Sequence, residues 1–108
     1  KIDKYLMFAL LNNYYSYYQL EKIGKEYGGG LLKLQKYDLE NIKFPNTTVI
    51  SQEDNETLKQ LAKKLLKAKS NYQKLIDDIT KIISHYSDIN YDLIKSNYLE
   101  KKRSRLEK

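Results

Sequence analysis

Apolar positions in the C-terminal half of the chain recur at helical spacing. Between residues 58 and 86 they alternate steps of three and four, as in a heptad repeat. These positions are Leu58, Leu61, Leu65, Ala68, Tyr72, Leu75, Ile79, Ile82 and Tyr86. Ser51, with Asp54 three residues later, is typical of a helix N-terminus. The pattern therefore predicts one long helix over residues 52–85, whose apolar seam pairs within the chain, with the N-terminal segment, or with a second copy.

The N-terminal segment has a different pattern. Apolar and aromatic residues follow one another with few polar positions between Ile2 and Gln19, so a helix here is apolar nearly all round. Such a helix is either buried or has lost the partner that covers it. Asp3 suits an N-cap or first-turn position, and Gly24 interrupts the pattern. We predict an apolar helix over residues 2–26.

Residues 27–50 begin with a glycine triplet and continue with short stretches in which apolar and polar residues alternate. The four glycines of the chain are Gly24 and the triplet Gly28, Gly29 and Gly30. Three residues without side chains favour a tight turn or a close approach of another backbone, and the simpler interpretation is a flexible helix C-terminus. Short strands are predicted around 31–34 and at 42–44, where Pro45 stops the second.

A last helix is predicted over residues 91–103, where Ile94 and Tyr98 give an apolar edge. The 108 residues suit a single domain or a fragment of one. The expected fold class is α+β and predominantly α, with long helices and a small two-stranded β element after the Gly-Gly-Gly turn.

The stretch from Tyr27 to Pro45 carries a resemblance to a known family. It contains Tyr-Gly-Gly-Gly, an apolar-Lys-apolar strand, an Asp-Leu turn and Ile-x-Phe-Pro. This order resembles the end of the target-recognition region in adenine-N6 DNA methyltransferases of type II restriction–modification systems. It is also similar to recognition domains of type I restriction specificity subunits. Those subunits carry a Pro-Pro-x-x-Glu-Gln sequence where this chain has Pro45-Asn46-Thr47-Thr48-Val49, which favours the methyltransferase branch.

The resemblance implies a non-catalytic, DNA-binding C-terminal region. The family's Asn/Asp-Pro-Pro-Tyr/Phe motif and its S-adenosylmethionine motif do not occur in this sequence, so we expect no cofactor in this fragment. Its implied partners are double-stranded DNA and an N-terminal catalytic domain of the same protein, which would bind S-adenosylmethionine. The parent chain is expected to be a site-specific adenine-N6 DNA methyltransferase.

Charge agrees with a polyanionic partner. Lys and Arg total 20 against 14 Asp and Glu, a formal charge of +6. A lysine-rich surface also keeps an ordinary helical domain in solution. Basic, aromatic and glycine residues gather near the triplet, where Lys side chains and backbone N–H groups can contact phosphates. The candidate DNA-binding residues are Lys25, Tyr27, Gly28, Gly29, Gly30, Lys33, Lys36 and Tyr37.

The sequence contains few residues of the kinds that catalyse reactions or bind metal ions. The chain has no cysteine and one histidine, His85, which we place on the surface at a helix end. The adjacent Asp77 and Asp78 are assigned to a solvated helix face near Lys74 and Lys81. We therefore predict no catalytic residues and no metal site. The missing cysteines fit the reducing cytoplasm, the expected location.

The apolar seam over residues 58–86 also supports an alternative function. The seam over 58–86 is also what a helical coiled-coil assembly module without a nucleic-acid role would show, and a homodimer through this seam is one form of it. A basic amphipathic membrane binder is a weaker alternative, because residues 2–26 lack a lysine-rich opposite face. No membrane partner is expected.

Overall fold

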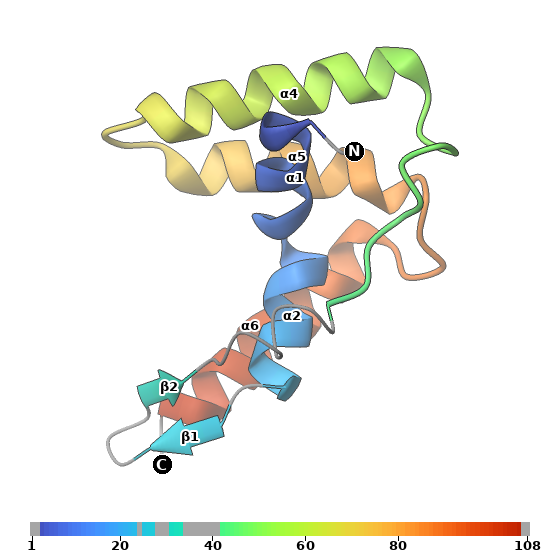
Figure 1. Ribbon diagram of the computed structural model, residues 1–108. Helices are drawn as coiled ribbons and strands as arrows, with labels where there is room; N and C mark the ends of the chain where they lie inside the picture. Colours follow the sequence, from blue (N-terminus) through green and yellow to red (C-terminus); the bar gives the residue numbers. More distant parts are fainter. Residues whose placement is uncertain (1–2, 24, 28–30, 34–41, 107–108) are drawn as a thin grey trace.

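The computed structural model describes residues 3–23, 25–27, 31–33 and 42–106. The order of elements is α1 (Lys4–Leu11), α2 (Tyr14–Ile23), β1 (Lys25–Tyr27), β2 (Leu31–Lys33), α4 (Gln52–Lys67), α5 (Tyr72–Ser84) and α6 (Tyr91–Leu106). Helix α1 packs against α4, α4 packs against α5, and α2 lies along α6 (Figure 1). In the described part of the chain, no helix is long and apolar enough to cross a membrane.

The predicted helix over residues 2–26 is in fact two helices. Asp3 caps α1 as expected, since its carboxylate accepts the N–H groups of Tyr5 and Leu6. The break falls at Asn13, whose side-chain amide donates to the carbonyls of Ala9 and Leu10 at 3.0 and 2.8 Å. Its side-chain oxygen accepts the N–H of Ser16 at the start of α2. One buried asparagine thus satisfies the end of one helix and the beginning of the next.

The single helix predicted over residues 52–85 is also divided. Ser51 caps α4 as predicted, with its hydroxyl accepting the Asp54 N–H at 3.1 Å. Helix α4 ends at Lys67, and Asn71 has φ 64° and ψ 23° before α5 begins. This left-handed conformation is incompatible with a continuous helix, and asparagine is among the residues that tolerate it. The chain turns back, so the two halves of the seam face each other.

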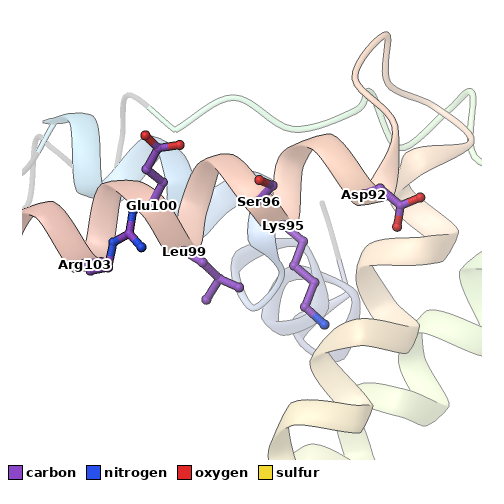
Figure 2. Close-up of a pocket in the computed structure, with 6 residues that line it drawn as sticks. All are labelled: Asp92, Lys95, Ser96, Leu99, Glu100 and Arg103. Atoms are coloured by element: carbon purple, nitrogen blue, oxygen red, sulfur yellow. The ribbon is translucent and has the colours of Figure 1, made fainter.

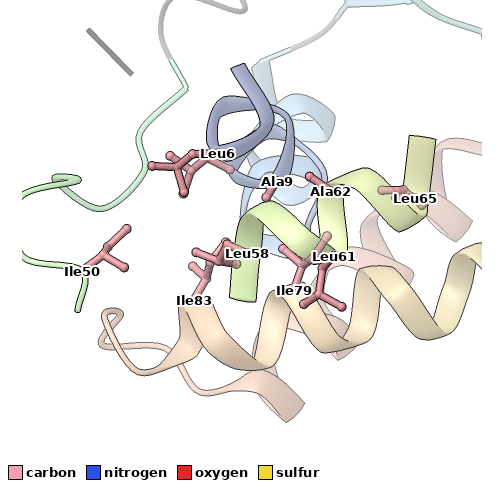
Figure 3. Packing of buried hydrophobic residues seen from close by; sticks show 10 residues of the cluster. Leu6, Ala9, Ile50, Leu58, Leu61, Ala62, Leu65, Ile79 and Ile83 are labelled. Carbon is pink, nitrogen blue, oxygen red and sulfur yellow. The ribbon is translucent and has the colours of Figure 1, made fainter. Parts of the chain in front are cut away.

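A core of ten buried residues joins α1, α4 and α5 (Figure 3). Leu58 of α4 and Ile79 of α5 are both 0% exposed. Members of the core from all contributing segments are Leu6, Ala9, Leu10, Ile50, Leu58, Leu61, Ala62, Leu65, Ile79 and Ile83. Most of the seam is therefore buried within one chain, although Tyr72 remains 48% exposed, and the apolar N-terminal helix packs against α4 rather than being left bare.

Helices α2 and α6 form a second packed pair. The rings of Tyr14 and Tyr17 lie 5.4 and 5.6 Å from the ring of Tyr98, between centroids. Near the other end, Arg105 donates two hydrogen bonds to the Glu21 carboxylate, at 2.7 and 3.0 Å. Helix α6 begins where predicted and runs three residues beyond the predicted end at 103.

The predicted α+β fold is wrong, because the packed core is formed by helices. The β structure is limited to β1 and β2, three residues each, which pair antiparallel with Lys25 opposite Lys33 and Tyr27 opposite Leu31. These strands lie on either side of the glycine triplet, whereas the sequence predicted both strands after it. Residues 42–46 have no regular secondary structure, so the predicted second strand is absent there. Ile42 is nevertheless buried, with 6% of its surface exposed, in agreement with its apolar character.

Candidate nucleic-acid interface

The structure describes only part of the predicted DNA-binding cluster. Lys25, Tyr27 and Lys33 have a described backbone in β1 and β2, and the register brings positions 25 and 33 opposite each other. The other predicted residues, Gly28, Gly29, Gly30, Lys36 and Tyr37, lie outside the described residues. The β1–β2 pair lies at one end of the molecule, beside the α2–α6 pair and away from α4 (Figure 1).

Gln19 of α2 fixes the chain where it returns from this region. Its side-chain amide donates to the Lys43 carbonyl, and its side-chain oxygen accepts the Lys43 N–H at 2.6 Å. The Gln19 amide group thus bonds both the N–H and the C=O of Lys43, as a paired residue of a neighbouring antiparallel strand would. The segment between Ile23 and Lys43 is therefore attached to α2 at both ends. It continues directly from α2 at Ile23, and Gln19 of α2 holds it by hydrogen bonds at Lys43.

A second basic surface surrounds the turn between α4 and α5. The sequence from 57 to 76 contains six lysines and no acidic residue. Five of these lysines are exposed: Lys63, Lys64, Lys67, Lys69 and Lys74. Lys74 pairs with Asp78 at 3.3 Å and Lys63 lies 5.0 Å from the ring centre of Tyr5. The turn at Asn71 brings the lysines at the end of α4 and the beginning of α5 together at one corner.

Asp77, predicted to lie on a solvated helix face, belongs instead to a polar cluster between two helices. Asp77 accepts the Tyr91 hydroxyl at 2.9 Å and pairs with the Lys95 ammonium at 3.2 Å. Lys95 also donates to the Tyr91 hydroxyl at 3.2 Å. Its neighbour Asp78 does lie on the predicted surface, paired with Lys74. The cluster joins α5 to α6, and no local sequence pattern indicates it because its members are 14 or more residues from Asp77.

Burial and hydrogen bonding shift the pKa of Asp77 in opposite directions. Desolvation raises the pKa of this carboxyl, but hydrogen bonds from Tyr91 and Lys95 and the positive charge of Lys95 outweigh it, so the net pKa is lowered. Desolvation, reinforced by the charge of Asp77, raises the pKa of the Tyr14 hydroxyl above its ordinary value. The hydrogen bond from Tyr91 and the ion pair with Lys95 therefore link Asp77 of α5 to α6.

We expect Asp77→Asn to lower the free energy of unfolding at neutral pH by about 1–2 kcal/mol, because it replaces charge-assisted hydrogen bonds. A carboxyl with a lowered pKa in the folded state contributes stability above its ordinary pKa and loses it as the pH falls through the folded value. The difference between variant and wild type should therefore shrink at a pH of about 3. Urea unfolding at both pH values measures it.

The neighbouring substitution Asp78→Asn is the control for Asp77→Asn. Asp78 pairs only with an exposed lysine whose side chain is 78% accessible, so its loss should cost less than about 0.5 kcal/mol. Equal effects of the two substitutions at neutral pH would contradict a stabilising role for the Asp77 cluster.

A shallow groove follows the face of α6 that carries Lys95 (Figure 2). It has a volume of about 480 Å³ and is lined by Asp92, Lys95, Ser96, Leu99, Glu100 and Arg103. All six residues come from the same helix, and acidic and basic side chains alternate along it. No second element contributes a converging group to this lining, so we do not assign a ligand to the groove.

Within the part of the chain that the structure describes, no set of three or more His, Asp or Glu side chains converges to hold a metal ion. His85 is the C-cap residue of α5 and is exposed, which confirms its predicted place at a helix end. Comparison of the chain with protein-family models, with curated proteins and with solved structures finds no match.

Proposed function

We propose that this chain is a non-catalytic DNA-binding region that contacts duplex DNA through the glycine-containing segment between α2 and residue 42. Its methyltransferase context, with S-adenosylmethionine bound by a separate catalytic domain, rests on the resemblance of Tyr27–Pro45. We also propose that the protein is located in the cytoplasm.

The observation that carries the proposal is the position and register of the β1–β2 pair. The pair brackets the three glycines and lies at the end of the molecule away from α4 (Figure 1). Its register sets two basic positions, 25 and 33, opposite each other. A basic, protruding backbone element next to residues without side chains suits phosphate contacts, since both lysines and N–H groups can reach a nucleic-acid backbone.

The alternative function, a coiled-coil assembly module, depends on a seam available to a partner. Leu58, Leu61 and Leu65 are each at most 9% exposed because α1 and α5 cover them. A homodimer through 58–86 would have to use what remains on the outer face, where Leu66 and Tyr72 are exposed. We therefore retain DNA binding as the proposed function.

Fluorescence anisotropy with a labelled DNA duplex, measured across a salt series, tests the proposal. We expect binding that weakens steeply with salt. The triple substitution Lys25→Gln/Lys33→Gln/Lys36→Gln should weaken binding and lower the slope of log K against log salt by up to about 3. Gly29→Val should also weaken binding with the helical circular-dichroism spectrum unchanged, since a β-branched side chain restricts the backbone at the triplet.

The matched control carries the same change of net charge at the other basic surface. Lys64→Gln/Lys67→Gln/Lys69→Gln removes three positive charges from the α4–α5 corner. If DNA contacts the glycine-containing segment, this variant keeps most of the affinity of the wild type. Equal losses in the two triple variants would show attraction by net charge alone and would contradict the proposed interface. Absence of binding at low salt would overturn the proposed function.

A further inference from the structure

A cavity of about 560 Å³ lies between α2, residues 43–45 and the connection from α5 to α6. Its floor includes Ile83 and Ile94, which are 2% and 1% exposed. The volume is in the range of small-molecule sites, and its walls come from three segments that are distant in the sequence. It is separate from both the β1–β2 pair and the groove on α6.

Four aromatic side chains line the cavity: Tyr15, Tyr18, Phe44 and Tyr86. Two of them are held by hydrogen bonds of their hydroxyl groups. Tyr15 donates to the Ile89 carbonyl, and Tyr86 donates to the Asp54 carboxylate and accepts the Ser51 N–H at 3.1 Å. Because these bonds hold the rings in place, the walls are already ordered before a ligand binds.

Charged side chains contribute to the same lining. Lys22 and Lys43 are both exposed, and the Lys22 ammonium lies 5.4 Å from the ring centre of Tyr18. Gln19 holds the backbone of Lys43 against α2. Asp88 also contributes to the lining, so its charge partly offsets that of the two lysines.

We propose that this cavity binds a nucleobase together with its phosphate. A planar base would stack against the aromatic walls, and the phosphate would lie between Lys22 and Lys43. Aromatic rings beside basic side chains are the combination by which proteins hold unpaired nucleotides. Two sources share this chemistry: a free nucleotide, and an unstacked base of a single strand. The strand source alone rests on the proposed DNA-binding function.

Chemical-shift titrations of the chain with dAMP, and separately with a short single-stranded oligonucleotide, test the proposal. We expect saturable shifts of residues around the cavity. Phe44→Ala should weaken binding about tenfold through lost stacking. Lys22→Gln and Lys43→Gln should each weaken it about threefold, and Lys64→Gln, on the far basic surface, should have no effect.

Asp88→Asn distinguishes a lost contact from a damaged fold. Removal of a carboxylate that repels phosphate should tighten binding about two- to threefold, an effect that unfolding cannot produce. Saturable dAMP binding that is sensitive to Phe44→Ala supports the free-nucleotide source. Saturation by the oligonucleotide alone, with the same sensitivity, supports the strand source. Absence of saturable binding to both probes would overturn the proposal, as would binding that Phe44→Ala leaves unchanged in a folded chain.

Variants can test the cavity and the duplex interface separately. The Lys25/Lys33/Lys36 triple variant should lose duplex binding and keep dAMP binding, whereas Phe44→Ala should do the reverse. Loss of both activities in both variants would contradict two separate sites.

Discussion

Replacement of Leu58 by alanine is expected to lower the free energy of unfolding by about 2–5 kcal/mol. Leu58 is 0% exposed and lies in the centre of the α1–α4–α5 core (Figure 3), so truncation leaves a cavity that rigid neighbouring helices cannot fill. Urea denaturation followed by circular dichroism measures the change. The size of the effect follows from the fold: the leucine is buried by its own chain and not by a second copy.

The same experiment separates an internal seam from a dimer interface. Leu66 follows the seam residue Leu65 but is 54% exposed, and Leu66→Ala should change stability by no more than about 0.5 kcal/mol. For wild type, the urea midpoint should not depend on protein concentration. A midpoint that rises with concentration, and that loses this dependence in Leu58→Ala, would show that the seam is shared between copies.

Arg105→Ala should have the second large effect, a loss of about 3 kcal/mol. The side chains of Arg105 and Glu21 are only 13% and 6% accessible, so removal of the guanidinium leaves a carboxylate with little water to replace it. Thermal and urea unfolding at neutral pH measure the loss. The effect should persist at high salt, since a partly buried pair is screened less than a surface pair.

A double replacement tests the explanation of the Arg105 effect. Glu21→Leu/Arg105→Leu removes both charges, and we expect it to recover most of the stability lost in Arg105→Ala. The exposed pair Lys74–Asp78 is the surface comparison, for which Lys74→Ala should cost less than about 0.5 kcal/mol. A double variant as unstable as Arg105→Ala would indicate that Arg105 stabilises α6 by its aliphatic packing instead.

Local patterns predicted where α1, α4 and α6 begin. Asp3 and Ser51 cap their helices as expected, because a cap depends on a side chain and the N–H groups two or three residues away. Periodicity identified the apolar faces of α4 and α5, and the start of α6 fell at the predicted residue. These features are encoded within a few neighbouring residues.

The breaks and the long-range contacts could not be predicted in this way. The apolar periodicity passes through residues 68–71 without a gap, although the backbone leaves the helical region at Ala68 and takes a left-handed conformation at Asn71. Asn13 looked like one polar residue in an apolar run, yet its amide caps two helices. The partners Glu21 and Arg105 are 84 residues apart, so only the tertiary fold brings them together.

The candidate site shows the same limit. The sequence pattern singled out the residues around the glycines, but no local motif indicates the cavity lined by Tyr15, Phe44 and Tyr86. Tyr15 and Tyr86 were taken as apolar positions of two helices, and their meeting with Phe44 depends on the turn between α4 and α5 and on the Gln19–Lys43 bonds.

The bonds between Gln19 and Lys43 have a consequence for how this chain can change over generations. They join positions 24 residues apart, so insertions and deletions between the end of α2 at Ile23 and Lys43 leave both the helices and this closure in place. The entropy of closing a loop grows slowly, by about 0.6 kcal/mol for each doubling of its length. Descendants of this sequence can therefore differ in the length and composition of that loop while they inherit one helical frame, and new binding preferences can arise there without a new fold.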